Sequence, residues 1–279
     1  MRKTEPKEEP LKILFYGIPG STKTRTSATA SNDPRTSPVL YLEAGGNPIA
    51  LRDYVNPPDI LHIDALEDFN PVYEWLATGQ DPKSPFCKDW DLHPPYRTLM
   101  IDQITDVQRM TMNKASGNMG TALVPGTIPN PMQIQHFGST LGHMVKFATL
   151  FYGLKDIHVI ITSQEREEKD DTTGLISYRP LLWGQSSTEF GGYAYMVSRL
   201  IHRSRVQIDN KLKLAIGEMP ENATSVALFM PSGKYMAKDQ YGMKDDDGSL
   251  LPFMVDPSIP KILDKIYGPG RGPAVVPMG

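Results

Sequence analysis

The segment from residue 11 to 28, LKILFYGIPGSTKTRTSA, constrains the fold of this chain more than any other stretch. An apolar run of β type leads into a turn with two glycines, and Lys23-Thr24 then opens a segment with helical character. In such a turn, backbone N–H groups and the positive end of the next helix surround a polyphosphate. The Lys reaches its β- and γ-phosphate oxygens, and the Thr hydroxyl holds magnesium. The segment therefore predicts a phosphate-binding loop; the alternative is an ordinary strand-to-helix turn of an α/β protein. The predicted nucleotide-binding residues are Gly17, Gly20, Ser21, Thr22, Lys23 and Thr24.

The turn departs at one position from the motif G-x-x-x-x-G-K-[ST], which has Gly immediately before the Lys. This chain has Thr22 there. A Cβ at this position restricts φ and crowds the phosphates. We therefore expect weaker nucleotide binding than a loop with the full motif would give.

Composition narrows the class of protein. The chain has 279 residues, of which 39% are hydrophobic, enough for a sizeable core. A net charge of -3 gives no overall attraction to nucleic acid, so such binding would depend on local basic loops. The single Cys87 excludes an internal disulfide framework, and the scattered histidines lack the paired spacing of a zinc site. No apolar run approaches the roughly 20 residues that cross a bilayer, and no signal-peptide core is present. We expect a soluble, cytoplasmic protein with no membrane partner.

Strand-like and helix-like segments alternate through the first two thirds of the chain, which predicts an α/β fold with a mainly parallel sheet and a β-rich C-terminal portion. The predicted strands are 11–16, 38–43, 60–63, 98–101, 157–162, 195–201, 211–216 and 225–229. The predicted helices are 23–30, 67–77, about 103–114, 135–154 and 257–267. Residues 79–96, 116–133 and 166–187 are predicted loops. One domain, 11–267, is expected between a flexible tail at 1–10 and a disordered Gly/Pro-rich tail at 268–279.

Asp102 ends the apolar strand TLMI and is the second predicted element of the nucleotide site. A carboxylate at the tip of a buried strand beside the phosphate loop can hold magnesium through water. The alternative is an N-cap for the helix that follows.

Two further strand ends supply polar side chains to the same predicted edge. Glu43 ends the strand PVLYLE and is the candidate to polarise the attacking water, or alternatively satisfies the turn that follows it. Gln164 follows the strand IHVIIT and can contact the γ-phosphate and relay its presence to the next loop; the alternative is an ordinary strand-end Gln.

Several segments together resemble the RecA-like ATPase core, in particular phage AAA-domain proteins related to RecA that act as single-strand annealing recombinases. GIPGSTKT resembles the Walker A motif, TLMID resembles Walker B, and VIITSQ resembles the RecA strand whose terminal Gln senses ATP. FGGYAYMVSRLIHRSR, at 190–205, resembles the stretch that leads into a basic strand in RecA. GKYMAKDQYG, at 233–242, resembles the segment that reaches a neighbouring subunit's γ-phosphate. The resemblance covers about residues 11 to 267.

This resemblance implies ATP and Mg²⁺ as cofactors and gives roles to individual residues. Lys23 and Thr24 become ligands of phosphate and magnesium, Asp102 the second metal-shell carboxylate, and Gln164 the sensor. Lys238 becomes a finger that acts in trans, against the alternative of a solvated hairpin lysine. Thr22 departs from the family pattern, as does Gln240, which stands where a second basic finger residue would be. Glu43-Ala44-Gly45 also departs, because RecA has Asp-Ala-Glu there. These departures imply a slow ATPase.

The resemblance also equates the two long polar segments, 116–133 and 166–187, with DNA-binding loops. Tyr178 and Trp183 are the predicted stacking partners for bases. Acidic residues interleave with the basic ones in the second segment and repel phosphates, so a solvated charged loop is the alternative. The predicted basic contacts are Lys114, Arg166, Lys169, Arg179, Arg199, Arg203, Arg205, Lys211 and Lys213.

The sequence and the resemblance together predict an ATP-binding and ATP-hydrolysing phage protein that acts on single-stranded DNA in recombination or annealing. We expect a ring or filament, in the cytoplasm of an infected bacterial host, with a single-strand-binding protein as a partner. The alternatives are a nucleotide-bound loader or structural adaptor with little turnover, and a replication or packaging motor.

Overall fold

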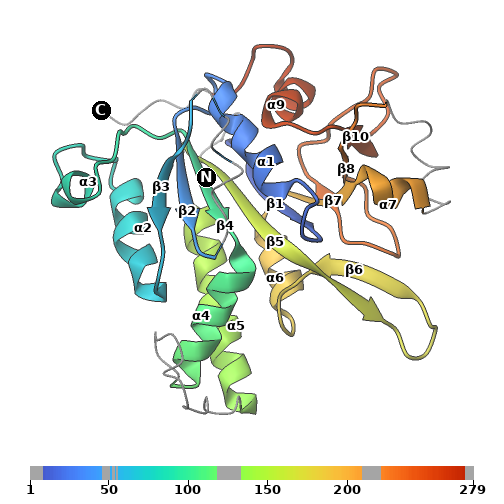
Figure 1. Ribbon diagram of the computed structural model, residues 1–279, viewed down its shortest axis with the longest axis horizontal. Helices are drawn as coiled ribbons and strands as arrows, with labels where there is room; N and C mark the ends of the chain where they lie inside the picture. Colours follow the sequence, from blue (N-terminus) through green and yellow to red (C-terminus); the bar gives the residue numbers. More distant parts are fainter. Residues whose placement is uncertain are drawn as a thin grey trace, which may run out of the picture.

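The computed structural model describes residues 9–45, 51, 54, 56–117, 133–208 and 221–273. Within this part of the chain, ten strands form one sheet in the order β10-β8-β7-β1-β5-β4-β2-β3, with β6 paired to β5 and β9 paired to β7 (Figure 1). The strands are β1 (Lys12–Gly17), β2 (Val39–Glu43), β3 (Asp59–His62), β4 (Thr98–Asp102), β5 (His158–Lys169), β6 (Ile176–Pro180), β7 (Met196–His202), β8 (Ser225–Leu228), β9 (Lys238–Asp239) and β10 (Phe253–Val255).

The helices separate or flank these strands. They are α1 (Lys23–Ala28), α2 (Phe69–Ala77), α3 (Pro85–Asp89), α4 (Ile104–Ala115), α5 (Ile134–Tyr152), α6 (Ser186–Tyr193), α7 (Arg203–Ile208) and α9 (Ile259–Tyr267), with 3-10 turns η1 (Thr29–Asn32) and η3 (Leu66–Asp68). No helix in the described ranges combines the length and the apolar character needed to cross a membrane.

The centre of the sheet is parallel. Strands β3, β2, β4, β5, β1 and β7 run in one direction, whereas β8 is antiparallel to β7 and β10 is antiparallel to β8. The predicted α/β class, with a mainly parallel sheet and a β-rich C-terminal portion, is therefore confirmed.

The core lies on both faces of this sheet, because strands buried on both sides need apolar residues at every position. Alternate residues of β1 divide between two clusters. Leu14 and Tyr16 pack with α2, α4, α5 and α6, and Ile13 and Phe15 pack with α1 and α9. This two-sided burial explains why continuous apolar runs predicted the central strands well.

The segment 166–187 is not the loop that the sequence predicts. β5 continues to Lys169 and pairs with β6, and the two form a ribbon that projects from the sheet (Figure 1). Backbone pairing holds this ribbon together with two ion pairs of Glu168, one along β5 to Arg166 at 2.5 Å and one across to Arg179 on β6 at 3.2 Å. Because it buries little apolar surface, its sequence lacks the alternation that marks a half-buried strand.

A second correction concerns the predicted loop 79–96, which contains the short helix α3. Ser84 caps it, accepting the N–H of Cys87 at 3.1 Å, and Pro85 occupies its first turn. A Ser-Pro pair is a known helix-start signal, so this element was detectable from the sequence.

Some predictions fall on residues that the structure does not describe. The predicted strand 211–216 lies outside the described residues, as do 118–132 of the first predicted loop, 1–8 and 274–279 of the predicted tails, and Lys211 and Lys213. The domain limits stay predictions. The described ends of the tails nevertheless contact the fold, since Pro10 O accepts from the Tyr241 hydroxyl at 2.9 Å and Arg271 O accepts from Arg35 at 2.7 Å.

Candidate nucleotide-binding site

The predicted site residues converge at the edge of the sheet where the parallel strands end. Gly17 at the end of β1 is in register with Gln164 on β5, and Glu43 at the end of β2 is in register with Asp102 on β4. Ligands of open α/β sheets bind at this carboxyl edge. The turn that follows β1 and leads into α1, residues 17–24, is called the phosphate loop below.

Lys23 is folded back onto the phosphate loop. Its Nζ donates to the carbonyl oxygens of Gly17 at 2.8 Å and Ile18 at 3.0 Å, and the residue is only 8% exposed. Burial lowers the Lys23 pKa to about 8, against the opposing effect of the carboxylates of Asp102 and Glu165. An anionic phosphate beside this amine would favour its charged form, so ligand binding and protonation of Lys23 are coupled.

Thr24 and Asp102 come together although 78 positions separate them in the chain. The Thr24 hydroxyl donates to Asp102 Oδ2 at 2.7 Å, and the Tyr41 hydroxyl donates to the same oxygen at 2.8 Å. The other carboxylate oxygen accepts from the Thr162 hydroxyl. Gln103, and not Asp102, occupies the N-cap position of α4, so the N-cap alternative for Asp102 is wrong.

Tyr41 and Thr162 contact the Asp102 carboxylate, and the sequence analysis did not name either residue. Burial, reinforced by the Asp102 charge, raises the pKa of Tyr41 far above its usual range, so the phenol stays a donor. One feature of the sequence indicated them: the apolar strands VLYLE and HVIIT, which flank the strand that carries Asp102, each contain one hydroxyl side chain. The three donors fix the carboxylate in one orientation.

Hard oxygen ligands of this kind suit Mg²⁺, which prefers one or two protein ligands together with substrate phosphates. The Thr24 hydroxyl and the Asp102 carboxylate are in direct contact, and they lie beside the loop that carries Lys23. The described residues include no group of three or more His, Cys, Asp or Glu side chains suited to a metal. The two oxygen ligands of Thr24 and Asp102 fit a metal that also binds polyphosphate oxygens.

The phosphate loop has a tightly constrained backbone. A Cβ on Gly17 would overlap the carbonyl oxygen of Leu200 on β7 and lie 2.5 Å from Ser21 Oγ. Gly20 has φ +78, and Thr22 has φ +68, both in the left-handed region. The Thr22 hydroxyl donates to Ser225 Oγ on β8 at 2.9 Å.

Glu43 and Gln164 both reach this edge of the sheet, and their catalytic roles stay predictions. The Glu43 carboxylate pairs with the imidazole of His62 at the end of β3. The Gln164 N–H donates to Thr105 Oγ1 at 3.1 Å, and its carbonyl accepts from Leu181 N at 2.7 Å. Through its backbone, Gln164 therefore joins the site to α4 and to the chain after β6.

Lys238 lies on β9, apart from the phosphate loop. Its Nζ donates to the carbonyl oxygens of Gly192 at 2.9 Å and Ala194 at 2.7 Å, and burial lowers its pKa. Its ammonium is therefore held within its own chain, and a role in trans stays a prediction that requires these two bonds to break.

Glu165, next to Gln164, forms a buried ion pair that the sequence analysis did not foresee. Arg199 donates to it twice, from Nε at 2.7 Å and from Nη2 at 2.9 Å, and the two side chains are 5% and 4% exposed. The Arg199 guanidinium also covers the Tyr178 ring at 3.8 Å. The expectation that Arg199 offers a basic contact to DNA is wrong, because its guanidinium is buried against Glu165. It also covers one face of the Tyr178 ring, and stacking of Tyr178 on a base stays a prediction.

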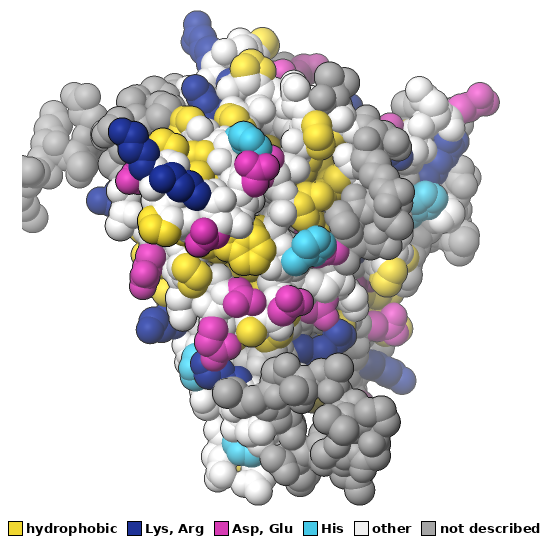
Figure 2. Space-filling model, turned by 60° about the vertical axis from the view of Figure 1, so that its left-hand side comes forward, with side chains coloured by type: hydrophobic (Ala, Val, Ile, Leu, Met, Phe, Trp, Pro, Cys, Tyr) yellow, Lys and Arg dark blue, Asp and Glu magenta, His cyan; other side chains and the backbone are white. Residues whose placement is uncertain are grey.

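Other predicted nucleic-acid contacts remain at the surface. Trp183, 53% exposed, stacks on Phe137 with ring centroids 6.2 Å apart. Lys114 pairs with Glu67. Figure 2 shows acidic and basic side chains interspersed over one face of the molecule, in keeping with the net charge of -3. The described residues of this face form no continuous basic patch.

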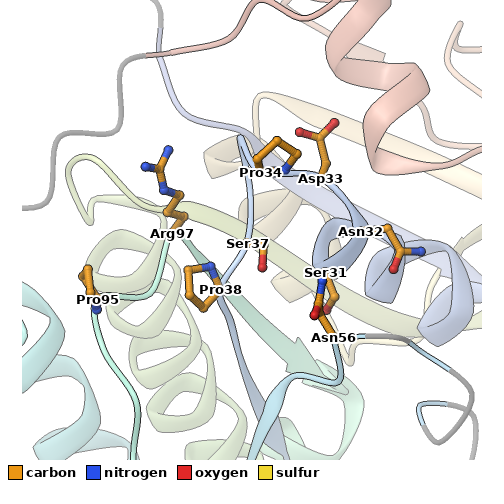
Figure 3. A pocket seen from close by; sticks show the side chains of 9 residues that line it. All are labelled: Ser31, Asn32, Asp33, Pro34, Ser37, Pro38, Asn56, Pro95 and Arg97. Atoms are coloured by element: carbon orange, nitrogen blue, oxygen red, sulfur yellow. The ribbon is translucent and has the colours of Figure 1, made fainter.

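A cavity of about 460 Å³ lies at the opposite edge of the sheet, where β2 and β4 begin (Figure 3). Its lining includes Ser31, Asp33 and Arg97. The Asp33 carboxylate is already paired with Arg35 at 2.5 Å. Because the phosphate loop follows the carboxyl end of β1, this cavity is not part of the nucleotide site.

Comparisons with known proteins place the chain in a family. A family model described as an AAA domain matches residues 9–241. The solved structures that resemble the chain include an ATPase domain with 12% identity, a TM-score of 0.44, and coverage of 94% of this chain and 84% of that one. A DnaB-like replicative helicase has 12% identity and a TM-score of 0.42, and the match covers 89% of this chain and 56% of the helicase. This chain therefore spans little more than half the length of that helicase. The RadB recombinase has 13% identity, a TM-score of 0.36, and coverage of 81% and 85%. No curated protein matches the chain in sequence.

Proposed function

The chain belongs to the AAA domain family, and from this premise we propose that it binds ATP with Mg²⁺ at the phosphate loop and hydrolyses it. The observation that carries the proposal is the contact between Thr24 and Asp102, 2.7 Å, beside the buried amine of Lys23. A hydroxyl, a carboxylate and an amine at one strand edge are the groups that a magnesium-bound polyphosphate requires.

In this proposal each side chain has a distinct task. Lys23 leaves the loop carbonyls and binds the β- and γ-phosphates, and Thr24 and Asp102 hold the metal. Bound magnesium would neutralise charge that develops on the phosphate oxygens. Glu43 is proposed to orient the attacking water, with its contact to the His62 imidazole holding the carboxylate in place, and Gln164 is proposed to sense the γ-phosphate.

Titration with a fluorescent ATP analogue tests binding, with magnesium and with excess EDTA. We expect Lys23→Ala to abolish saturable binding, whereas Lys265→Ala, a change at a surface ion pair with Asp246, leaves it intact. Equal binding by the wild type and Lys23→Ala would overturn the proposal. Phosphate release by the wild type separates an ATPase from the alternative of a nucleotide-bound adaptor without turnover.

We also propose that single-stranded DNA contacts the ribbon of β5 and β6 together with the aromatic pair Phe137 and Trp183. Stacking on an exposed aromatic contributes about 1–3 kcal/mol per base. We expect Trp183→Ala to weaken binding of a labelled oligonucleotide at low salt about tenfold or more. The matched control is Trp90→Ala, since Trp90 is also 53% exposed. Equal affinities of the two variants would contradict this part of the proposal.

Self-association into a ring or filament, with Lys238 acting in trans, completes the proposed function. If Lys238 serves a neighbour's phosphates, mixing Lys238→Ala with Lys23→Ala subunits should recover ATPase activity at shared interfaces. Absence of recovery at every mixing ratio would count against it. A role in recombination or annealing in a phage, with a single-strand-binding protein, stays a prediction from the family resemblance.

A further inference from the structure

Thr22 adopts a backbone conformation that its side chain opposes. Its φ of +68 and ψ of 12 place it in the left-handed region, immediately before α1. A β-branched residue is a genuine outlier there, because its Cβ crowds the following carbonyl group. The conformation therefore needs support from elsewhere in the fold.

Ser225 is placed to give that support. The Thr22 hydroxyl donates to Ser225 Oγ at 2.9 Å across 203 positions of sequence, while Thr26 Oγ1 is more distant at 3.5 Å. Ser225 is 3% exposed and begins β8, which is paired to β7. Its N–H donates at 3.1 Å to Asp256 Oδ1, which also accepts the Thr224 N–H at 2.7 Å.

We propose that Ser225 is a positioning residue for nucleotide binding: it holds Thr22 in the left-handed conformation and thereby directs Lys23 and Thr24 toward the phosphates. The Thr22–Ser225 hydrogen bond replaces the freedom that glycine would give at this position. It also ties the phosphate loop to the C-terminal β portion, through β8 and Asp256. The affinity prediction rests on the proposed function.

A double-mutant cycle tests the inference. In the wild-type background we expect Ser225→Ala to weaken binding of the ATP analogue about tenfold, because Thr22 loses its restraint. In the Thr22→Gly background, where the left-handed conformation needs no support, the same change should alter affinity less than twofold. Ser198→Ala is the control, since Ser198 is a buried serine whose hydroxyl bonds Leu228 O between β7 and β8, away from the loop.

Hydrogen exchange of the nucleotide-free protein provides a second readout that does not depend on the proposed function. Ser225→Ala should speed exchange in a peptide covering the phosphate loop when Thr22 is present, and leave it unchanged when Gly replaces Thr22. Equal effects in both backgrounds, on exchange or on affinity, would show that Ser225 acts only through general stability and would overturn the inference. No effect in either background would also overturn it. Failure of the wild type to bind nucleotide, with the exchange pattern as expected, would refute the proposed function alone.

Discussion

The buried ion pair between Glu165 and Arg199 offers the sharpest test of how this fold is stabilised near its site. Both side chains are almost fully buried, two hydrogen bonds of 2.7 and 2.9 Å join them, and the guanidinium lies 3.8 Å from the Tyr178 ring centroid. Arg199→Met keeps much of the side-chain volume but leaves the carboxylate buried without its partner. Breaking a buried pair in this way costs about 3–5 kcal/mol.

The double variant Glu165→Gln with Arg199→Met removes both charges, so it should recover most of that loss. Replacing both members of a buried pair is often close to neutral. We therefore expect a coupling free energy of about 3 kcal/mol or more between the two changes. Urea unfolding at pH 7, followed by circular dichroism, measures the free energy of unfolding of each variant.

A matched control lies on the adjoining ribbon. Arg179, 43% exposed, pairs with Glu168 at 3.2 Å, and Arg179→Met should cost no more than about 1 kcal/mol because exposed pairs contribute little. The reasoning would be refuted if Arg199→Met cost no more than this control. Simple addition of the two single losses in the double variant would refute it as well.

Three further predictions concern pH, the loop and the carboxylate. His158, whose Nδ1 accepts a backbone N–H, has its pKa lowered by burial to about 3 from 6.5, so the unfolded chain binds the extra proton between these values. Because the unfolded imidazole is already half protonated at pH 6.5, the free energy of unfolding should fall by about 1.6 kcal/mol from pH 6.5 to 5 in the wild type, and by less in His158→Gln. An equal fall in both proteins, measured by urea unfolding, would contradict this. Gly17→Ala should destabilise the protein by about 1–3 kcal/mol and weaken nucleotide binding, because the added Cβ would overlap the carbonyl oxygen of Leu200. An unchanged Tm would contradict this. Tyr41→Phe removes one hydrogen-bond donor to Asp102 and should lower the free energy of unfolding, measured in urea, by about 1.5–3 kcal/mol. An unchanged free energy of unfolding would contradict this.

Much of the fold was predictable because the central strands are buried on both faces. Runs such as KILFYG and TLMID contain few polar residues, and their lengths and spacing indicate a parallel sheet with helices between strands. The ribbon of β5 and β6 was not predictable in this way. The end of β5 is a run of charged residues of both signs and β6 contains only one charge, so neither shows an apolar pattern. Backbone pairing, which hydropathy does not register, determines the shape of the ribbon.

The site likewise contains residues that were predictable from the sequence and residues that were not. Lys23, Thr24 and Asp102 were predictable as neighbours, since parallel strands bring their carboxyl ends to one edge. The groups that hold these three side chains in place were not predictable. Ser225 is 203 positions from Thr22, and nothing local distinguishes it from any other serine at a strand start. Long-range hydrogen bonds between common side chains carry no pattern that one sequence reveals.

The two outermost strands of the sheet have a consequence for association. Across the described ranges, β3 at one border has four residues and β10 at the other has three. Short border strands expose few unpaired amide and carbonyl groups, which limits the growth of a sheet from one molecule into the next. If the protein self-associates as proposed, we therefore expect its copies to contact one another through side chains and not by pairing β3 or β10 across the interface, so that they can dissociate without breaking a shared sheet.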